Sequence, residues 1–148
     1  QASQIPWGVL LLFAGGICLA RGFVASGLSA QVGEALTLVA TLPVFLMMLL
    51  LALVVTFLTE ATSNTATTAL LMPVLAAVAL AVDIDPLWLM VPAAMSASCA
   101  FMLPVATAPN AVVFGSGELP IQRMVREGLM LNLFGAIVIA GLMALILQ

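Results

Sequence analysis

The chain has 148 residues, of which 65% are hydrophobic and 6% charged, with three basic side chains, six acidic ones and no histidine. A soluble domain usually has about a quarter of its residues charged, so this composition excludes a soluble globular protein and a disordered chain. It also excludes a nucleic-acid binder, which needs a basic face. Without histidine, and with only two cysteines, a zinc site of the usual type is excluded as well. The composition predicts an integral membrane protein.

Five apolar stretches of helical length follow one another along the chain, with a weaker amphipathic piece after the first. The stretches cover residues 5–20, 42–58, 67–82, 87–114 and 129–147, and the amphipathic piece covers residues 26–38. We expect the first helix to end at Arg21 and Gly22, the amphipathic piece to lie along the interface, and the last helix to span in one piece. The expected fold is all-α. Because Gln1 is not an initiator methionine and no signal-peptide pattern precedes the first apolar stretch, we expect a piece of a longer protein or a processed one.

The last apolar stretch carries a small residue or an asparagine at every fourth position. The series is Gly128, Asn132, Ala136, Ala140 and Ala144. Small residues let helix backbones approach closely in lipid, so this stripe predicts a helix-packing face and not a binding site.

Three arginines give the only indication of orientation. Arg123 and Arg126 precede the last helix, and Arg21 follows the first. Because cytoplasmic loops carry an excess of basic residues, the pair predicts cytoplasm at that loop and a C-terminus on the non-cytoplasmic side.

A polar segment interrupts the apolar pattern at residues 59–68, where eight of ten side chains are polar. It is either an ordinary surface loop between two short spans or the tip of a re-entrant hairpin. Its hydroxyl and amide chemistry favours the hairpin. Thr62, Ser63 and Asn64 are N-cap residues, so the following helix begins with free N–H groups, beside which Thr65 adds a donor. The preceding arm ends in free carbonyl groups, which together with threonine and asparagine oxygens could hold a sodium ion.

A second interruption lies in the fourth stretch. Pro104 and Pro109 each remove a helical hydrogen bond, so carbonyl groups around residues 100–106 need other partners, and Thr107 and Asn110 are the polar groups placed to use the opening. A simple proline kink is the alternative. Two breaks in apolar segments together are the pattern of a transporter binding site.

The distribution of charge limits what such a site can hold. No lysine, arginine or histidine lies between Gly22 and Gln122, so a bound anion must be compensated by helix dipoles and a bound cation, for which sodium is the obvious candidate. If the substrate is instead a cation, as in a channel or pump, Glu60 is its counter-charge. A purely structural role for Glu60 in a polar cavity is the other possibility. No nucleophile–base pair or metal cluster can be assembled, so an enzyme is not expected.

The residues at these two breaks resemble the divalent anion–sodium symporter family, which carries di- and tricarboxylates or sulfate. That family has a Ser-Asn-Thr motif at the tip of each of two re-entrant hairpins, and here the motif is Ser63-Asn64-Thr65. The family's other motif reads Ala97-Ser98-x-x-Phe101-x-x-Pro104-Val105-Ala106-x-x-x-Asn110-x-Val112-Val113 in this chain. The resemblance extends from about residue 5 to the C-terminus.

The resemblance implies the C-terminal part of the second of two inverted repeats, in a transporter that works by an elevator movement. Residues 1–40 would be a scaffold helix with an interfacial helix, and residues 41–148 a portion of the transport domain. That portion would comprise a re-entrant hairpin (42–82), a broken helix (87–117) and the last transmembrane helix (122–147). The implied partners are the N-terminal half of the same protein, lipid and a second copy in a homodimer. The implied location is a bacterial inner membrane.

The resemblance also assigns residues to a substrate site and a sodium site. Ser63, Asn64, Thr65 and Thr107 would bind the substrate, and Thr59, Thr62, Asn64 and Ala106 would hold a co-transported sodium ion. The implied function is sodium-coupled transport of C4-dicarboxylates such as succinate. Many relatives have a second proline where this chain has Ala108, and the family also contains sodium-independent exchangers and sulfate transporters, so these remain alternatives.

Overall fold

The computed structural model describes the chain except for residues 1–6, 29, 32–33, 35–41 and 147–148. The principal helices are α1 (Trp7–Ala25), α3 (Val44–Ala61), α4 (Asn64–Ala81), α5 (Leu87–Ser96), α6 (Ala108–Gly115) and α7 (Ile121–Ile146). The described part of the chain contains no strand, which confirms the all-α expectation. The expected interfacial piece at 26–38 lies largely outside the described residues.

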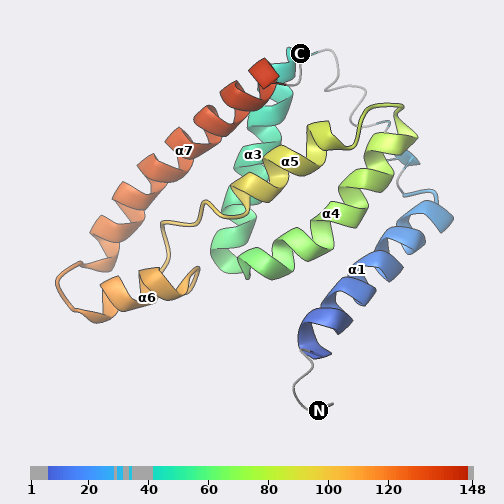
Figure 1. Ribbon diagram of the computed structural model, residues 1–148. Helices are drawn as coiled ribbons and strands as arrows, with labels where there is room; N and C mark the ends of the chain where they lie inside the picture. Colours follow the sequence, from blue (N-terminus) through green and yellow to red (C-terminus); the bar gives the residue numbers. More distant parts are fainter. Residues whose placement is uncertain (1–6, 29, 32–33, 35–41, 147–148) are drawn as a thin grey trace.

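The helices form a layered arrangement around α5 (Figure 1). α3 and α4 make a helical hairpin that opens like a V, and α5 packs against both arms. α7 lies against α3 and α5 on one side, whereas α1 lies against α4 on the other. This order places the short helix α5 and the chain that follows it between the hairpin and α7.

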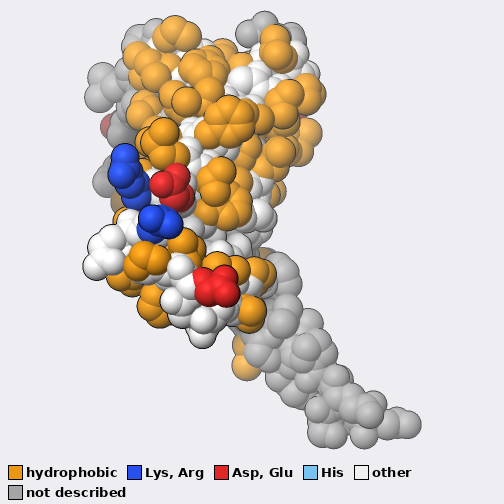
Figure 2. All heavy atoms as spheres, turned by 90° about the vertical axis from the view of Figure 1, so that its left-hand side faces the viewer, with side chains coloured by type: hydrophobic (Ala, Val, Ile, Leu, Met, Phe, Trp, Pro, Cys, Tyr) orange, Lys and Arg blue, Asp and Glu red, His pale blue; other side chains and the backbone are white. Residues whose placement is uncertain are grey.

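In the part of the chain that the structure describes, three helices are long and apolar enough to cross a membrane. They are α3 and α4, with 18 residues each, and α7, with 26. An 18-residue helix is about 27 Å long at 1.5 Å per residue, close to the hydrocarbon thickness of a bilayer. Figure 2 shows hydrophobic side chains over most of one face and charged ones gathered in a narrow band. Such a distribution is typical of a helix bundle in lipid.

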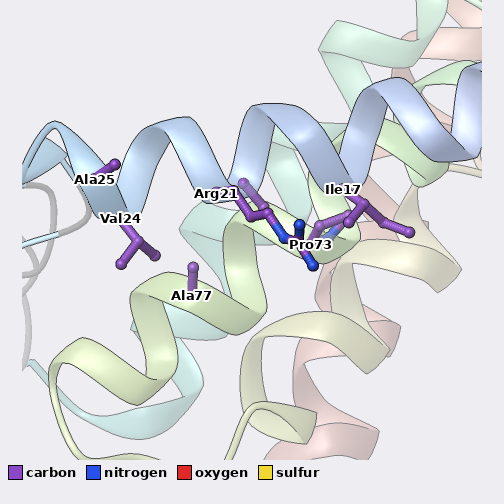
Figure 3. A pocket seen from close by; sticks show the side chains of 7 residues that line it. Ile17, Arg21, Val24, Ala25, Pro73 and Ala77 are labelled. Atoms are coloured by element: carbon purple, nitrogen blue, oxygen red, sulfur yellow. The ribbon is translucent and has the colours of Figure 1, made fainter.

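The first helix is longer than expected. α1 continues through Arg21 and Gly22 to Ala25, so the prediction that it ends at Arg21 and Gly22 is wrong. A single arginine or glycine lowers helix stability too little to end a helix that packs along its length against α4. Arg21 therefore lies within α1 and not in a loop, and it lines a shallow groove between α1 and α4 (Figure 3).

α1 and α4 are in close contact beside a proline of α4. Pro73 lies inside α4 and has no N–H to donate to the Ala69 carbonyl oxygen one turn earlier. A Cβ atom added to Gly16 of α1 would lie 2.7 Å from that oxygen. Only a glycine therefore allows this contact.

α5 and α6 are two halves of a broken helix. α5 ends at Ser96, and α6 begins after its N-cap residue Thr107, whose hydroxyl accepts a hydrogen bond from the Asn110 N–H at 3.2 Å. The break was expected near Pro104, but it begins at Ala97. Side chains of α3 and α7 accept hydrogen bonds from the N–H groups of residues 101–103. The helix therefore ends before the chain reaches Pro104, as described below.

The predicted packing face of α7 is confirmed. All five residues of the stripe are buried, namely Gly128, Asn132, Ala136, Ala140 and Ala144. The two alanines nearest the C-terminus pack with Met48 of α3 in one apolar cluster. At the other end, the absence of a side chain at Gly128 lets α7 touch the backbone of Phe101 and Met102 in the broken segment.

We expect Gly128→Ala to lower the thermal stability of the intact protein. The new methyl group would lie 2.6 Å from the Met102 Cα atom, and overpacking of this kind typically costs about 1–3 kcal/mol. The matched control is Gly115→Ala in α6, where a Cβ atom meets nothing within 4 Å. The melting temperatures of both variants in detergent are the measurement. Equal melting temperatures would contradict a close contact between α7 and the break.

Candidate functional site

The polar segment at residues 59–68 forms helix ends and not a loop. Only Thr62 and Ser63 lie outside α3 and α4. Ser63 is the N-cap of α4, and its hydroxyl oxygen accepts a hydrogen bond from the Ala66 N–H at 3.4 Å. In the described part of the chain no hydrogen bond engages the N–H groups of Asn64 and Thr65. These two donors point out of the positive end of the helix, the arrangement that binds anions.

A hollow of about 280 Å³ lies beside this helix end. Four residues of the first turns of α4 line it, Asn64, Thr65, Thr68 and Ala69, and the chain after α5 contributes Ser98. The hollow therefore joins the hairpin tip to the broken helix. Sequence reasoning missed Thr68 and Ser98 as site residues, although Ser98 is part of the second motif.

Two of the four expected sodium ligands meet at one point. The Thr59 hydroxyl lies 2.6 Å from Asn64 Oδ1 and 3.1 Å from the Ala97 carbonyl oxygen. Because a hydroxyl carries one proton, it can donate to only one of these acceptors at a time. Three neutral oxygen atoms thus gather beside the end of α3, and oxygen atoms are the ligands that hard cations prefer. The Ala97 oxygen was not among the expected ligands.

The side chains and backbone of the other expected residues make different contacts. The Thr62 hydroxyl donates to the Leu58 carbonyl oxygen at 2.8 Å and lies 2.6 Å from the Thr67 hydroxyl. Ala106 is buried, and its N–H donates to the Leu103 carbonyl oxygen. Thr107 caps α6 and does not line the hollow. Ser63 is exposed at the turn.

Buried polar groups continue one helical turn deeper. Thr56 precedes Thr59 on the same face of α3, and its hydroxyl approaches the Ser96 carbonyl oxygen at 3.4 Å. The Ser96 hydroxyl is buried without a hydrogen-bond partner among the described residues. A buried hydroxyl without a partner is uncommon in proteins. The row of polar groups formed by the Thr56, Thr59 and Ser96 side chains and the Ala97 carbonyl is therefore unusual for an apolar core.

Glu60 is a third polar feature, and it faces the break. Its side chain is only 3% exposed. One carboxylate oxygen accepts hydrogen bonds from the Met102 N–H at 2.8 Å and the Asn132 side-chain amide at 2.6 Å, and the other accepts one from the Leu103 N–H at 2.9 Å. Both oxygens are thus occupied by donors of the protein.

Two asparagines complete the hydrogen bonding of the broken segment. The Asn132 side-chain oxygen accepts from the Phe101 N–H at 3.3 Å. The Asn110 amide donates to the carbonyl oxygens of Ala100 and Leu103, at 2.8 and 3.0 Å. Asn110 thus satisfies the Ala100 carbonyl oxygen, for which Pro104 has no N–H to donate, and adds a second donor to the Leu103 carbonyl oxygen. Asn132 was expected only as part of a packing stripe. The feature of the sequence that could have indicated its role is a single asparagine in a series otherwise made of glycine and alanines.

Comparison with known proteins identifies relatives along nearly the whole chain. The family model described as sodium:sulfate symporter transmembrane region matches residues 1–147. Sodium-dependent dicarboxylate transporter SdcS of Staphylococcus saprophyticus is 49% identical over 138 residues, which is 93% of this chain and 27% of the relative. The proteins of the same name from Staphylococcus aureus strains USA300 and N315 are also 49% identical over 93% of this chain, and 26% of each is covered.

The chain thus spans about a quarter of the length of the curated relatives that it matches, and each of these is named as a transporter. The match of the family model covers the hairpin, the broken helix and the last helix. The resemblance seen in the two motifs is therefore confirmed, and the chain belongs to the sodium:sulfate symporter family.

Proposed function

We propose that this chain is part of a secondary transporter that carries C4-dicarboxylates across a membrane together with sodium ions. The observation that carries the proposal is the meeting of an N-terminal helix end, with free N–H donors at Asn64 and Thr65, and a cluster of neutral oxygen atoms around Thr59. The first suits an anion and the second suits a cation. The names of the relatives, sodium-dependent dicarboxylate transporters, support this choice over sulfate or a sodium-independent exchanger. They also support a carrier and not an enzyme.

The substrate carboxylate would bind at the hairpin tip. Ser63, Asn64 and Thr65 would supply hydroxyl, amide and backbone donors, and Thr107 would approach from the start of α6. The hollow lined by Asn64, Thr65, Thr68 and Ser98 supports this assignment. Since no basic residue lies between Gly22 and Gln122, the helix end supplies part of the positive potential and a bound cation the rest.

The sodium ion would bind beside the substrate. Thr59, Asn64, Thr62 and the Ala106 carbonyl are its proposed ligands. The short distance between the Thr59 hydroxyl and Asn64 Oδ1, 2.6 Å, supports the first two. Asn64 belongs to both sites, so binding of the ion would orient the side chain that the anion uses. Through this shared residue, binding of the sodium ion would directly affect binding of the anion.

The larger organisation is also a proposal. Residues 41–148 would belong to a moving transport domain, with the α3–α4 hairpin re-entrant, and residues 1–40 to a scaffold. The N-terminal half of the same protein would supply the other binding half, and two copies would form a homodimer. We place the protein in a bacterial inner membrane with its C-terminus on the non-cytoplasmic side, on the strength of Arg123 and Arg126.

A cation channel or pump that uses Glu60 as its counter-charge is less well supported. Both oxygens of the Glu60 carboxylate already accept hydrogen bonds from the protein. A cation bound there would have to displace at least one of these donors.

We expect Asn64→Ala and Thr65→Ala, each in the intact protein, to reduce sodium-driven succinate uptake by about tenfold or more, since each removes a hydrogen bond to a charged group. The measurement is uptake of labelled succinate into vesicles, with sodium or with choline outside. Gln122→Ala, at the exposed start of α7, is the control and should transport normally. Full transport by both site variants would refute the site. Uptake that is unchanged in choline would refute sodium coupling.

The variant Ser63→Cys tests the depth of the hairpin tip. We expect a membrane-impermeant thiol reagent to label the new thiol from one side of the membrane only, and saturating succinate to slow the labelling, because the residue would lie in the substrate site. The comparison is Glu118→Cys, at a position that is exposed and outside the proposed site. Labelling of the Ser63→Cys variant that succinate does not affect would identify the turn as an ordinary surface loop.

A further inference from the structure

Glu60 and Asn132 together hold three consecutive backbone N–H groups of the broken segment. Asn132 accepts from Phe101, and Glu60 accepts from Met102 and Leu103. The two side chains are joined by the hydrogen bond from the Asn132 amide to Glu60 at 2.6 Å. We call this pair the clamp. It connects the end of α3, the middle of α7 and the chain between α5 and α6.

The chemistry of the clamp is directional. A carboxylate has only acceptors, so both of its oxygens can face N–H donors. Asn132 is fully buried and uses its two ends differently, with its amide toward Glu60 and its oxygen toward Phe101. A glutamine at position 60 would put an N–H group against an N–H group of the broken segment, and an ionised aspartate at position 132 would put an oxygen atom against the Glu60 carboxylate, so neither change alone reproduces this pattern.

The clamp also lies next to the proposed sites without being part of them. Glu60 directly follows Thr59, whose hydroxyl meets Asn64 Oδ1 and the Ala97 carbonyl oxygen. Within the broken segment, residues 101–103 lie between Ser98, which lines the hollow, and Thr107. A shift of residues 101–103 would therefore move site groups on both sides of them.

We propose that Glu60 and Asn132 are positioning residues that fix the backbone of the broken segment, and through it the groups at residues 97–98 and 106–107 that would bind sodium and substrate. They act through the backbone and touch neither transported species. This inference rests on the proposed function for its consequence in transport, whereas the clamp itself is tested independently of transport.

The experiment exchanges the two chemical groups of the clamp in the intact protein. Asn132→Asp, measured at an alkaline pH that keeps both carboxyl groups ionised, would set a carboxylate oxygen against Glu60 where an amide now donates, so this variant should be the most damaged. Glu60→Gln removes one acceptor and should be damaged less. In the double variant, the new amide at position 60 can donate to the new carboxylate at position 132, and that carboxylate can still accept from the Phe101 N–H. The Met102 N–H shares its Glu60 oxygen with the Asn132 amide and loses its acceptor in the double variant. We therefore expect the double variant to recover a substantial part, but not all, of what Asn132→Asp loses. Glu118→Gln, the same change at an exposed carboxylate, is the control.

The first readout is amide hydrogen exchange of the peptide containing residues 101–103, measured by mass spectrometry. We expect exchange to be about tenfold faster or more in Asn132→Asp, with substantial recovery in the double variant and no change in Glu118→Gln. A double variant that exchanges as fast as Asn132→Asp, or an Asn132→Asp protein that exchanges like the wild type, would overturn the clamp.

The second readout is the KM for succinate and the half-saturating sodium concentration, normalised to the protein in the membrane. A positioning role predicts that both rise, by about tenfold in Asn132→Asp, with recovery in the double variant. If exchange responds but neither constant changes, the clamp is merely structural and the positioning role is refuted. If the wild-type protein itself fails to transport succinate with sodium, the proposed function fails, while the exchange result for the clamp still stands.

Discussion

The main constraint on this structure is that a peptide backbone outside a helix must find hydrogen-bond partners where the surroundings are apolar. The chain between α5 and α6 is not helical for eleven residues, 97–107. An unpaired peptide group buried in such surroundings costs several kcal/mol by order of magnitude. Glu60, Asn132 and Asn110 supply the missing partners. The break is thus stable because polar side chains of three helices, α3, α6 and α7, converge on it.

This constraint also explains the form of the hairpin. A carboxylate at the end of α3 would be costly in an apolar setting, but the donors of the broken segment surround it. The same turn of α3 carries Thr59, which faces the start of α4 and the end of α5. One turn of one helix therefore fixes both the break and the oxygen cluster beside it. Structural support and candidate chemistry share residues that are neighbours in the sequence.

Much of this organisation could be predicted because its causes are local. Ser63 caps α4, Pro109 lies in the first turn of α6, and the five stripe residues of α7 are buried, each for reasons visible within a few residues. The two motifs at the breaks were sufficient to indicate the family, and the family model confirms it. Hydrophobic stretches predicted the positions of α3 and α4 to within three residues, whereas α7 begins eight residues before the stretch at 129–147.

What could not be predicted depends on contacts between distant residues. Glu60 and Asn132 are 72 positions apart, so no local pattern reveals that they meet. The early start of the break at Ala97 follows from that meeting, and sequence reasoning placed it near Pro104. Arg21 was expected to follow a helix because it is charged, but packing of α1 on α4 carries the helix past it.

The partners of the broken segment also determine the order in which the chain can be assembled. Asn132 and Gly128 belong to α7, which is synthesised after residues 97–107. Until α7 is in place, the Phe101 N–H has no Asn132 to bind, and Glu60 lacks its third donor. The hairpin and α5 can form earlier, but the break reaches its final conformation only when the last helix docks. Folding of this region is therefore completed from the C-terminal side, and the loosest part of the unfinished chain is the one on which its proposed activity depends.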